Sequence, residues 1–412
     1  MMRPVFPALS LLAALASAAT PVRSAAQELS TVARLVDSLK MYVEGASGLT
    51  FRRPPRFAVQ DRRQVKAYIE RQLDRPGAAD QMRGQTIAYY LFGLMPDTLV
   101  RRRQLVDAHA ALLHGYYDPE TDTLYVAAGQ PPSALVEVVS HELVHALQDQ
   151  QVDLGTLLDE LPDDDARRAA RMIFEGQATF ASLRLLAGGR NIVGYTGIWR
   201  ELVRFMKLDP SVHPSFKRIP LVMRENLIGP YVYGAEFMSW WQGWQFADSA
   251  PFGARMPRST EQVLHPAHYV SGDEPLPLAF ADADSAAFAE GVLGELEIHL
   301  LAAQLAGESR LEHLQPLGWG GDRYRVYTSA AGPALVWYAA WDDSESAAAF
   351  ARGLGRKLGA RRRAGYRAQL DTLTVEDRAV TRYIFAPAAW TRWGTPPALR
   401  TPLTPSVASP AR

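Results

Sequence analysis

The sequence predicts an α+β fold that is mainly α-helical, and three observations support this prediction. The chain has 412 residues, 48% of them hydrophobic, which is enough for more than one domain with a substantial core. Helical spacing of apolar residues dominates the first third, and strand-like alternation first appears at residues 115–127. From about residue 291, helix and strand patterns follow one another, which indicates a smaller α+β unit.

The individual elements follow from apolar spacing and from breaker residues. Before residue 190, helical spacing recurs in these segments: 29–44, 61–73, 80–94, 99–113, 134–148 and 166–186. Ser133 is the expected N-cap of the fifth helix, and the Pro-interrupted stretch 51–59 is expected to be an extended connection. The aromatic segment 230–241 favours a buried helix face over a substrate pocket. Further along, strands are expected at 322–328, 333–341 and 379–385, with a helix at 344–358.

The N-terminus predicts a signal peptide at residues 1–26. Arg3 precedes an apolar run at 5–19 that is too short to span a bilayer comfortably. Residues 24–26 fit a small-x-small cleavage site, residues 16–18 offer a second one, and an uncleaved membrane anchor is the alternative. The mature protein is therefore expected to be soluble, without a membrane partner, and periplasmic or extracellular.

Charge and cysteine content exclude several classes of function. Basic and acidic residues balance at 44 each, so no overall field favours nucleic acid or an anionic membrane. The basic runs at 101–103 and 361–363 are typical of solvated surface, and the acidic run at 163–165 is expected to start a helix rather than bind a metal. The chain has no cysteine, which excludes disulfides, thiolate metal ligands and a cysteine nucleophile.

The segment H-E-L-V-H at 141–145 is the strongest functional motif. On a helix, residues i and i+4 lie on one face, so His141 and His145 can bind one metal ion. Glu142 leaves the helix at a different angle and is suited to act as a general base on a water in an open coordination position. The alternative is that this pattern occurs by chance on a surface helix, and the residues around the motif are needed to distinguish the two interpretations.

A later helix is predicted to supply the third metal ligand. Glu175 lies between apolar residues 173–174 and the small residues Gly176 and Ala178. A carboxylate in such a helix needs a partner, and the small residues would let this helix approach the His141 helix closely. Glu175 would then complete the site.

These motifs resemble the gluzincin group of zinc metallopeptidases, whose third ligand is a glutamate on a later helix. Y-Y-D-P-E-T at 116–121, H-E-L-V-H-A-L-Q-D-Q at 141–150 and E-G-Q-A-T at 175–179 are similar to a poorly characterised group of exported bacterial metallopeptidases. The resemblance extends over about residues 110–350. It implies a zincin-like catalytic domain in which a sheet edge lies beside the cleft; such an edge can pair with an extended peptide, although an ordinary core hairpin is equally compatible with these strands.

Three positions limit the resemblance. Metzincins are disfavoured, because their motif would need glycine at 148 and histidine at 151, where this chain has Gln148 and Gln151. The best-known gluzincins carry an acidic residue one turn beyond the third ligand, where this chain has Thr179. The sequence therefore does not identify the side chain that orients the zinc histidines, and Asp149 and Glu137 are the candidates.

Peptidases of this kind usually need a histidine or tyrosine that stabilises the developing oxyanion. His265 is the first candidate, followed by Tyr231, Tyr233 and His268, and a histidine in a structural turn is the alternative for His265. The other histidines outside the motif have no evident partner and are expected to be structural or on the surface: His109, His114, His213, His299 and His313.

The expected function is an exported zinc-dependent peptidase acting on peptide or protein substrates, with one zinc ion per chain and no nucleic-acid partner. The expected segments are the signal peptide, a zincin-like domain with a helical N-terminal part at 27–290, an α+β unit at 291–390 and a disordered tail at 391–412. The alternative is a catalytically silent zincin-fold protein that binds or assembles partners in the cell envelope. Glu142 favours the peptidase, because a purely structural zinc site would be closed by a fourth protein ligand.

Overall fold

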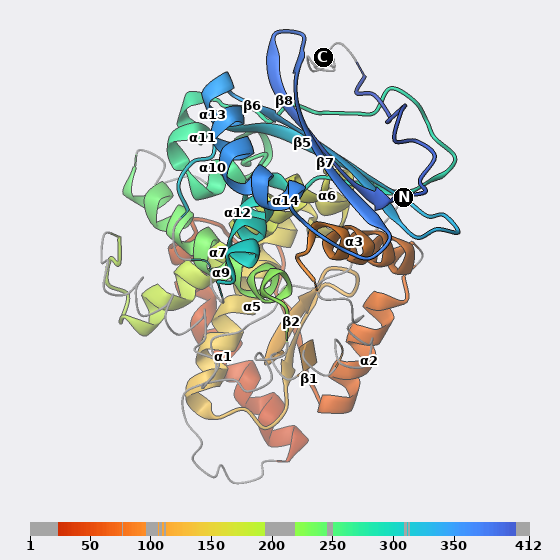
Figure 1. Cartoon of the computed structure of the whole chain (residues 1–412). Coiled ribbons are helices and arrows are strands. Elements are labelled where there is room, and N and C mark those ends of the chain that lie inside the picture. The colour runs from red at the N-terminus through yellow and green to blue at the C-terminus, as the bar shows by residue number, and fades with distance from the viewer. Residues whose placement is uncertain are drawn as a thin grey trace.

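The computed structural model describes residues 24–75, 77–95, 113–193, 219–244, 250–308 and 314–400, together with residues 106, 109, 110 and 311. The fold is α+β and mainly helical, as the sequence predicts. A five-stranded sheet lies in the upper half of Figure 1 and a three-stranded sheet in the lower half, with helices between them. Most of the predicted signal peptide and of the predicted helix at 99–113 lies outside the described residues.

The helices and strands alternate along the chain in two groups. The first group contains α1 (Ala25–Ser47), β1 (Arg56–Gln60), α2 (Arg62–Leu73), α3 (Ala78–Phe92), β2 (Gly115–Asp118), β3 (Thr123–Ala127), α5 (Pro132–Val152), α6 (Leu154–Glu160) and α7 (Asp164–Leu186). The second contains α9 (Leu221–Gly243), η2 (Gly253–Arg255), α10 (Thr260–Leu264), α11 (Pro266–Ser271), β4 (Ala287–Gly291), α12 (Gly294–Ala306), β5 (Trp319–Tyr327), β6 (Ala334–Trp341), α13 (Ser344–Phe350), η3 (Ala351–Gly355), α14 (Arg356–Gly359), β7 (Tyr366–Val375) and β8 (Arg378–Pro387).

Side-chain caps explain where several helices begin. Ser24, Asp61 and Asp163 each accept a hydrogen bond from the backbone N–H three residues later, at the start of α1, α2 and α7. Helix α5 differs from the prediction, because it begins at Pro132 with Pro131 as its N-cap instead of Ser133. Proline is well suited to the first turn, since its missing N–H has no helical partner there.

The three-stranded sheet has the order β1-β3-β2, with β1 parallel and β2 antiparallel to β3. The segment expected to be an extended connection thus contains a strand, β1, that pairs with β3. The five-stranded sheet has the order β4-β5-β6-β8-β7 and is antiparallel throughout. The prediction of a disordered tail from residue 391 is wrong for its first part, because Leu399 forms a bridge with Phe280 and is buried.

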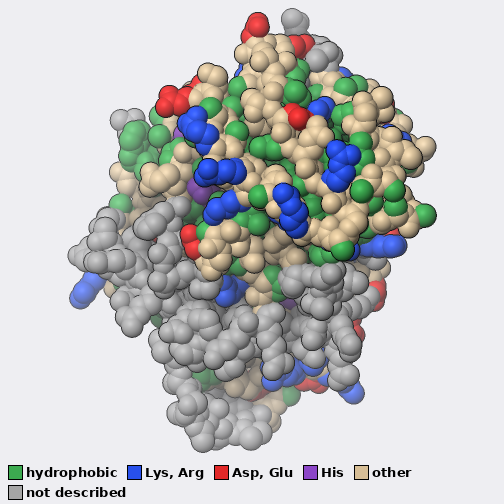
Figure 2. Space-filling model, viewed as in Figure 1, with side chains coloured by type: hydrophobic (Ala, Val, Ile, Leu, Met, Phe, Trp, Pro, Cys, Tyr) green, Lys and Arg blue, Asp and Glu red, His purple; other side chains and the backbone are tan. Residues whose placement is uncertain are grey.

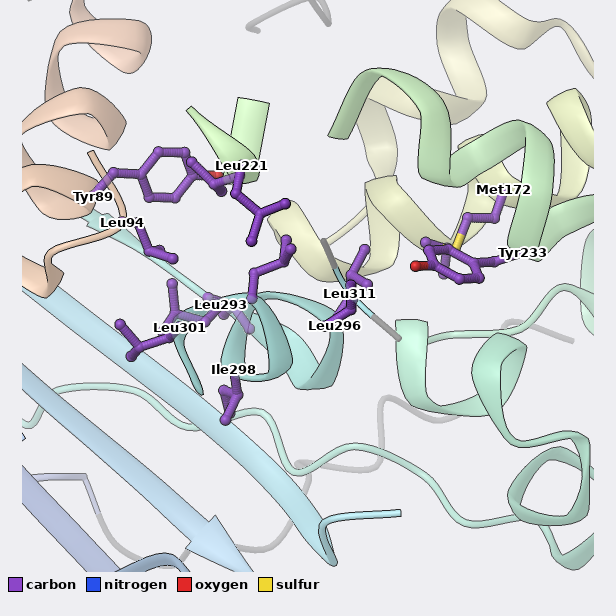
Figure 3. Packing of buried hydrophobic residues seen from close by; sticks show 14 of the residues in the cluster. Tyr89, Leu94, Met172, Leu221, Tyr233, Leu293, Leu296, Ile298, Leu301 and Leu311 are labelled. Carbon is purple, nitrogen blue, oxygen red and sulfur yellow. The ribbon is translucent and has the colours of Figure 1, made fainter. Parts of the chain in front are cut away.

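One large hydrophobic cluster joins the two halves of the chain. It runs from Val65 in α2 to Phe385 in β8 and includes residues of α7, α9 and α12. Figure 3 shows part of this cluster, where side chains from α3, α9 and α12 come together, Tyr89, Leu221 and Leu296 among them. The predicted 27–290 and 291–390 units therefore share a core.

The described surface is mixed in character. On the face shown in Figure 2, Lys and Arg side chains are scattered among hydrophobic and uncharged side chains. Within the described residues, we find no helix with the length and apolar character needed to cross a bilayer.

Candidate metal centre

The two motif histidines and Glu175 meet in the interior between α5 and α7. The Nε2 atoms of His141 and His145 are 3.1 Å apart, and Glu175 Oε2 lies 3.1 Å from the first and 3.4 Å from the second. Both histidines have no exposed surface, and Glu175 is 7% exposed. The structure thus brings together the three side chains that the sequence selects as ligands.

The spacing of these atoms fits one zinc ion. Tetrahedral zinc with bonds of about 2.0–2.1 Å holds its ligand atoms about 3.3 Å apart, and the distances here are 3.1 to 3.4 Å. Without a cation, the two Nε2 atoms would lie next to each other and next to the same carboxylate. At least one Nε2 atom must then be unprotonated, so it has no proton to donate to Glu175. Two imidazoles and a carboxylate are also a donor set of catalytic zinc sites.

The ionisable groups of this centre are strongly coupled. Burial opposes a charged carboxylate, but the two histidines outweigh it and lower the pKa of Glu175 to about 2. Burial also opposes a charged imidazole, yet Glu175 raises the pKa of His145 to about 9. The pKa of His141 is lowered, because burial outweighs its hydrogen bond with Glu175. One proton is therefore retained on the histidine pair, and a bound dication would replace it.

Gln148 orients one of the two histidines, which the sequence analysis does not anticipate. Its Oε1 lies 2.8 Å from His145 Nδ1, while its Nε2 donates to the carbonyl of Phe174 and to Gln177 Oε1. Because Nε2 faces two acceptors, Oε1 is left to accept the proton of His145 Nδ1, and His145 Nε2 keeps a lone pair for a metal. Gln148 lies about one helical turn beyond His145, so its spacing in the sequence could have identified it as the residue that orients His145.

Asp149 and Glu137, the two residues expected to orient the histidines, have other surroundings. Asp149 accepts hydrogen bonds from the Tyr117 hydroxyl and the backbone N–H of Leu154. Glu137 is buried, and among the described residues neither of its carboxyl oxygens has a hydrogen-bond partner. Burial, and then the charge of Glu142, raise the pKa of Glu137 to about 8, so Glu137 is protonated at neutral pH.

Small residues set the position of α7, but not in the way the sequence suggests. Gly176 faces α9, where an added Cβ would meet the backbone carbonyl carbon of Gly234 at 2.1 Å. Ala178 is packed in a cluster that contains Val139 and Leu143 of α5. The close approach predicted for α5 therefore uses Ala178, whereas Gly176 lets α7 and α9 cross in contact.

Glu142 lies on the side of α5 that faces β2. A Cβ added at Gly115, the first residue of β2, would meet Val138 Cγ1 at 2.5 Å and Glu142 Cγ at 3.4 Å, so glycine permits this close packing. Strand β2 is at an edge of its sheet, but all four of its residues are buried. The ring of Tyr68 stacks on that of Tyr116 in this strand, with ring centroids 4.0 Å apart. The other edge strand, β1, is half-buried or exposed.

The four candidates for oxyanion stabilisation occupy different surroundings. Only for Tyr231 is a ring contact with the motif histidines found in the described residues: it stacks on His141 with ring centroids 5.7 Å apart. The Tyr233 hydroxyl donates to Glu225, and His268 Nδ1 lies 2.7 Å from Asp273 Oδ2. His265 Nε2 lies 3.2 Å from Glu295 Oε2, in a cluster separate from the His141 centre.

Comparisons with known proteins concern the C-terminal part of the chain. Residues 284–389 match a family described as "Domain of unknown function (DUF8575)". This range includes α12 and strands β4 to β8 but not the two helices of the His141 centre. No curated protein and no solved structure matches the chain.

Proposed function

We propose that this protein is an exported zinc-dependent peptidase. The main support is the convergence of His141, His145 and Glu175 within 3.4 Å of one another, with a further carboxylate, Glu142, adjacent to the first ligand in sequence. Two imidazoles and one carboxylate leave a fourth position on zinc for a water or substrate, as catalytic sites require. Export rests on the charged, apolar and small-residue regions at the N-terminus.

His141, His145 and Glu175 would hold the metal, and Gln148 would keep His145 in the tautomer that binds it. When bound, zinc polarises a carbonyl group and makes a water molecule more acidic. Glu142 would accept a proton from the attacking water and transfer it to the leaving nitrogen. Tyr231 replaces His265 as our candidate for oxyanion stabilisation, since its ring stacks on that of His141.

One observation favours a second candidate, the catalytically silent scaffold. His141, Glu142 and His145 have no exposed surface, and the neighbouring edge strand β2 is buried as well. A peptide can reach Glu142 only if this region opens, whereas a protein that uses the fold to bind a partner in the cell envelope needs no access to the metal. The peptidase remains the proposal, because a scaffold gives no reason for an acidic residue at 142.

Glu142→Gln is the variant that tests the mechanism. It keeps the size of the side chain but removes the base, so cleavage should fall by about 10²–10⁴-fold while bound zinc is unchanged. The measurement is turnover of a mixture of internally quenched peptides, with zinc determined by elemental analysis of the same samples. Retained turnover in Glu142→Gln would refute the mechanism.

Glu137→Gln is the matched control for that experiment. Glu137 is buried in the same helix and is protonated at neutral pH, with a pKa raised to about 8 by burial and by Glu142. A neutral amide should therefore replace it with little change in turnover or zinc content. Zinc-loaded wild-type protein that cleaves no peptide, yet holds a partner in a stable complex, would favour the scaffold instead.

A further inference from the structure

A second group of histidines and carboxylates lies apart from the proposed active site. His265 occupies the junction between α10 and α11, and Glu295 and His299 lie one turn apart on α12. Glu295 Oε2 is 3.2 Å from His265 Nε2, and Glu295 Oε1 is 3.8 Å from His299 Nε2. The side chains of the three residues are 10%, 0% and 7% exposed, in the order His265, Glu295, His299.

These side chains lie at ion-pair distance without the alignment of hydrogen bonds. His265 Nε2, His299 Nε2 and Glu295 Oε2 are buried, and among the described residues none of these three atoms has a hydrogen-bond partner. His265 Nε2 and Glu295 Oε2 approach to 3.2 Å without the alignment that a hydrogen bond needs. Buried polar atoms are rarely left in this state, and a cation bound among the three side chains would supply the missing partner.

A backbone N–H group holds Glu295 in place, and a further buried carboxyl group, Glu261, lies on α10. The backbone N–H of Leu317 donates to Glu295 Oε1 over 2.7 Å, and Oε2 lies next to His265 Nε2. Glu261 is also buried, and its Oε1 lies 4.0 Å from His268 Nδ1.

We propose that His265, Glu295 and His299 bind a second divalent cation of the zinc class, which fastens the α10–α11 junction to α12. Two imidazoles and a carboxylate suit zinc and neighbouring first-row transition metals better than calcium or magnesium, which prefer oxygen ligands only. Since Glu295 and His299 lie in the 284–389 match and His265 lies before it, this ion would tie that region to the preceding helices.

The test is zinc content per chain of the full protein, purified without a metal-affinity tag, loaded with Zn²⁺ and freed of excess metal. We expect about two zinc ions in the wild type and about one in each of His299→Gln and Glu175→Ala, with near none in the double variant. His114→Gln is the control, because His114 lies next to Gln130 and belongs to none of the candidate metal-binding groups in the described residues. Circular dichroism identifies any variant that is not folded, and Glu295→Gln then replaces His299→Gln.

The outcomes separate this inference from the proposed function. One zinc ion in the wild type that is lost in Glu175→Ala but kept in His299→Gln would overturn the second centre and leave the peptidase proposal intact. One zinc ion that is kept in Glu175→Ala but lost in His299→Gln would support the second centre and remove the peptidase proposal. A folded wild type that takes up no zinc would overturn both.

Discussion

The two histidine and carboxylate centres differ in how closely their ligand atoms are gathered. In the His141 centre, three ligand atoms lie 3.1 to 3.4 Å apart, and one helix supplies both histidines. In the His265 centre, the two histidine-to-carboxylate distances are 3.2 and 3.8 Å, and the histidines come from different elements. A metal would complete the first centre almost without movement, whereas in the second it would draw separate elements together.

The side chains next to the ligands differ as well. Glu142, the proposed base, follows His141 directly, whereas burial and the charge of Glu295 raise the pKa of Glu261, on α10, to about 10. Gln148 holds the first centre through hydrogen bonds to His145 and to α7. Asp322 holds the second by binding the start of α12. We infer that the first centre is arranged for reaction and the second for attachment.

Asp322→Ala should have the largest effect on stability and should act on the second centre. Asp322 is buried and accepts hydrogen bonds from the backbone N–H groups of Leu293 and Gly294 and from the indole N–H groups of Trp319 and Trp337. Removal of the acceptor leaves these donors buried and unpaired, which should lower the free energy of unfolding by about 4 kcal/mol. Urea unfolding followed by circular dichroism measures the loss.

Asp343→Ala is the control for this variant. Asp343 is a helix N-cap that accepts from Ser346 N–H, and its loss should cost about 1 kcal/mol. If Asp322→Ala is no more damaging than Asp343→Ala, the structural role given to Asp322 is wrong. Zinc content in Asp322→Ala sharpens the comparison, because the second centre should weaken while the first is unchanged.

Gly176→Ala should come next and should act on the first centre. An added Cβ would meet the backbone carbonyl carbon of Gly234 at 2.1 Å, so α7 must move away from α9 and carry Glu175 with it. We expect a loss of about 3 kcal/mol in stability and weaker zinc binding at His141 and His145. Calorimetric unfolding and zinc titration test both effects.

Gly45→Ala separates the clash from the general effect of replacing glycine in a helix. Gly45 lies in α1, and an added Cβ there would have no atom within 4 Å. This change should stabilise the protein by about 0.5–1 kcal/mol. Equal behaviour of the two variants would show that the α7–α9 contact does not position Glu175.

Local pattern accounts for the parts of the molecule that could be predicted from the sequence. The His141 helix and the meeting of Glu175 with both histidines follow from i, i+4 spacing and from a carboxylate among apolar neighbours. The partner of Gly176 did not follow, because Gly176 alone does not reveal which helix it faces. Strand β7 was missed as well, since Tyr366–Val375 lies at the edge of the described sheet, next to β8, and is mostly half-buried or exposed, which weakens its apolar pattern.

The second centre was missed for a different reason. His299 was expected to have no partner, yet Glu295 and His299 have the same i, i+4 spacing on α12 that made His141 and His145 conspicuous. His265 joins them only because α10 packs against α12. A ligand that comes from a distant turn has no signature in sequence spacing, so the group becomes visible only once the chain is folded.

Gln148→Leu should have the smallest effect of the three and tests how the first centre is held. Leucine keeps the volume of the side chain but cannot accept the proton of His145 Nδ1, so the imidazole is no longer held in the metal-binding tautomer. Loss of such a partner weakens metal binding by about 10–100-fold. Zinc affinity is measured by competition with a chelating dye in the His299→Gln background, so that only the first centre contributes.

Gln151→Ala is the control for this variant. Gln151 lies on the same helix but donates a hydrogen bond to the carbonyl of Thr50, so its loss should leave the zinc affinity unchanged. Equal affinities in the Gln148 and Gln151 variants would mean that the geometry of α5 alone positions His145, and the first centre would then need no support from the network that reaches α7.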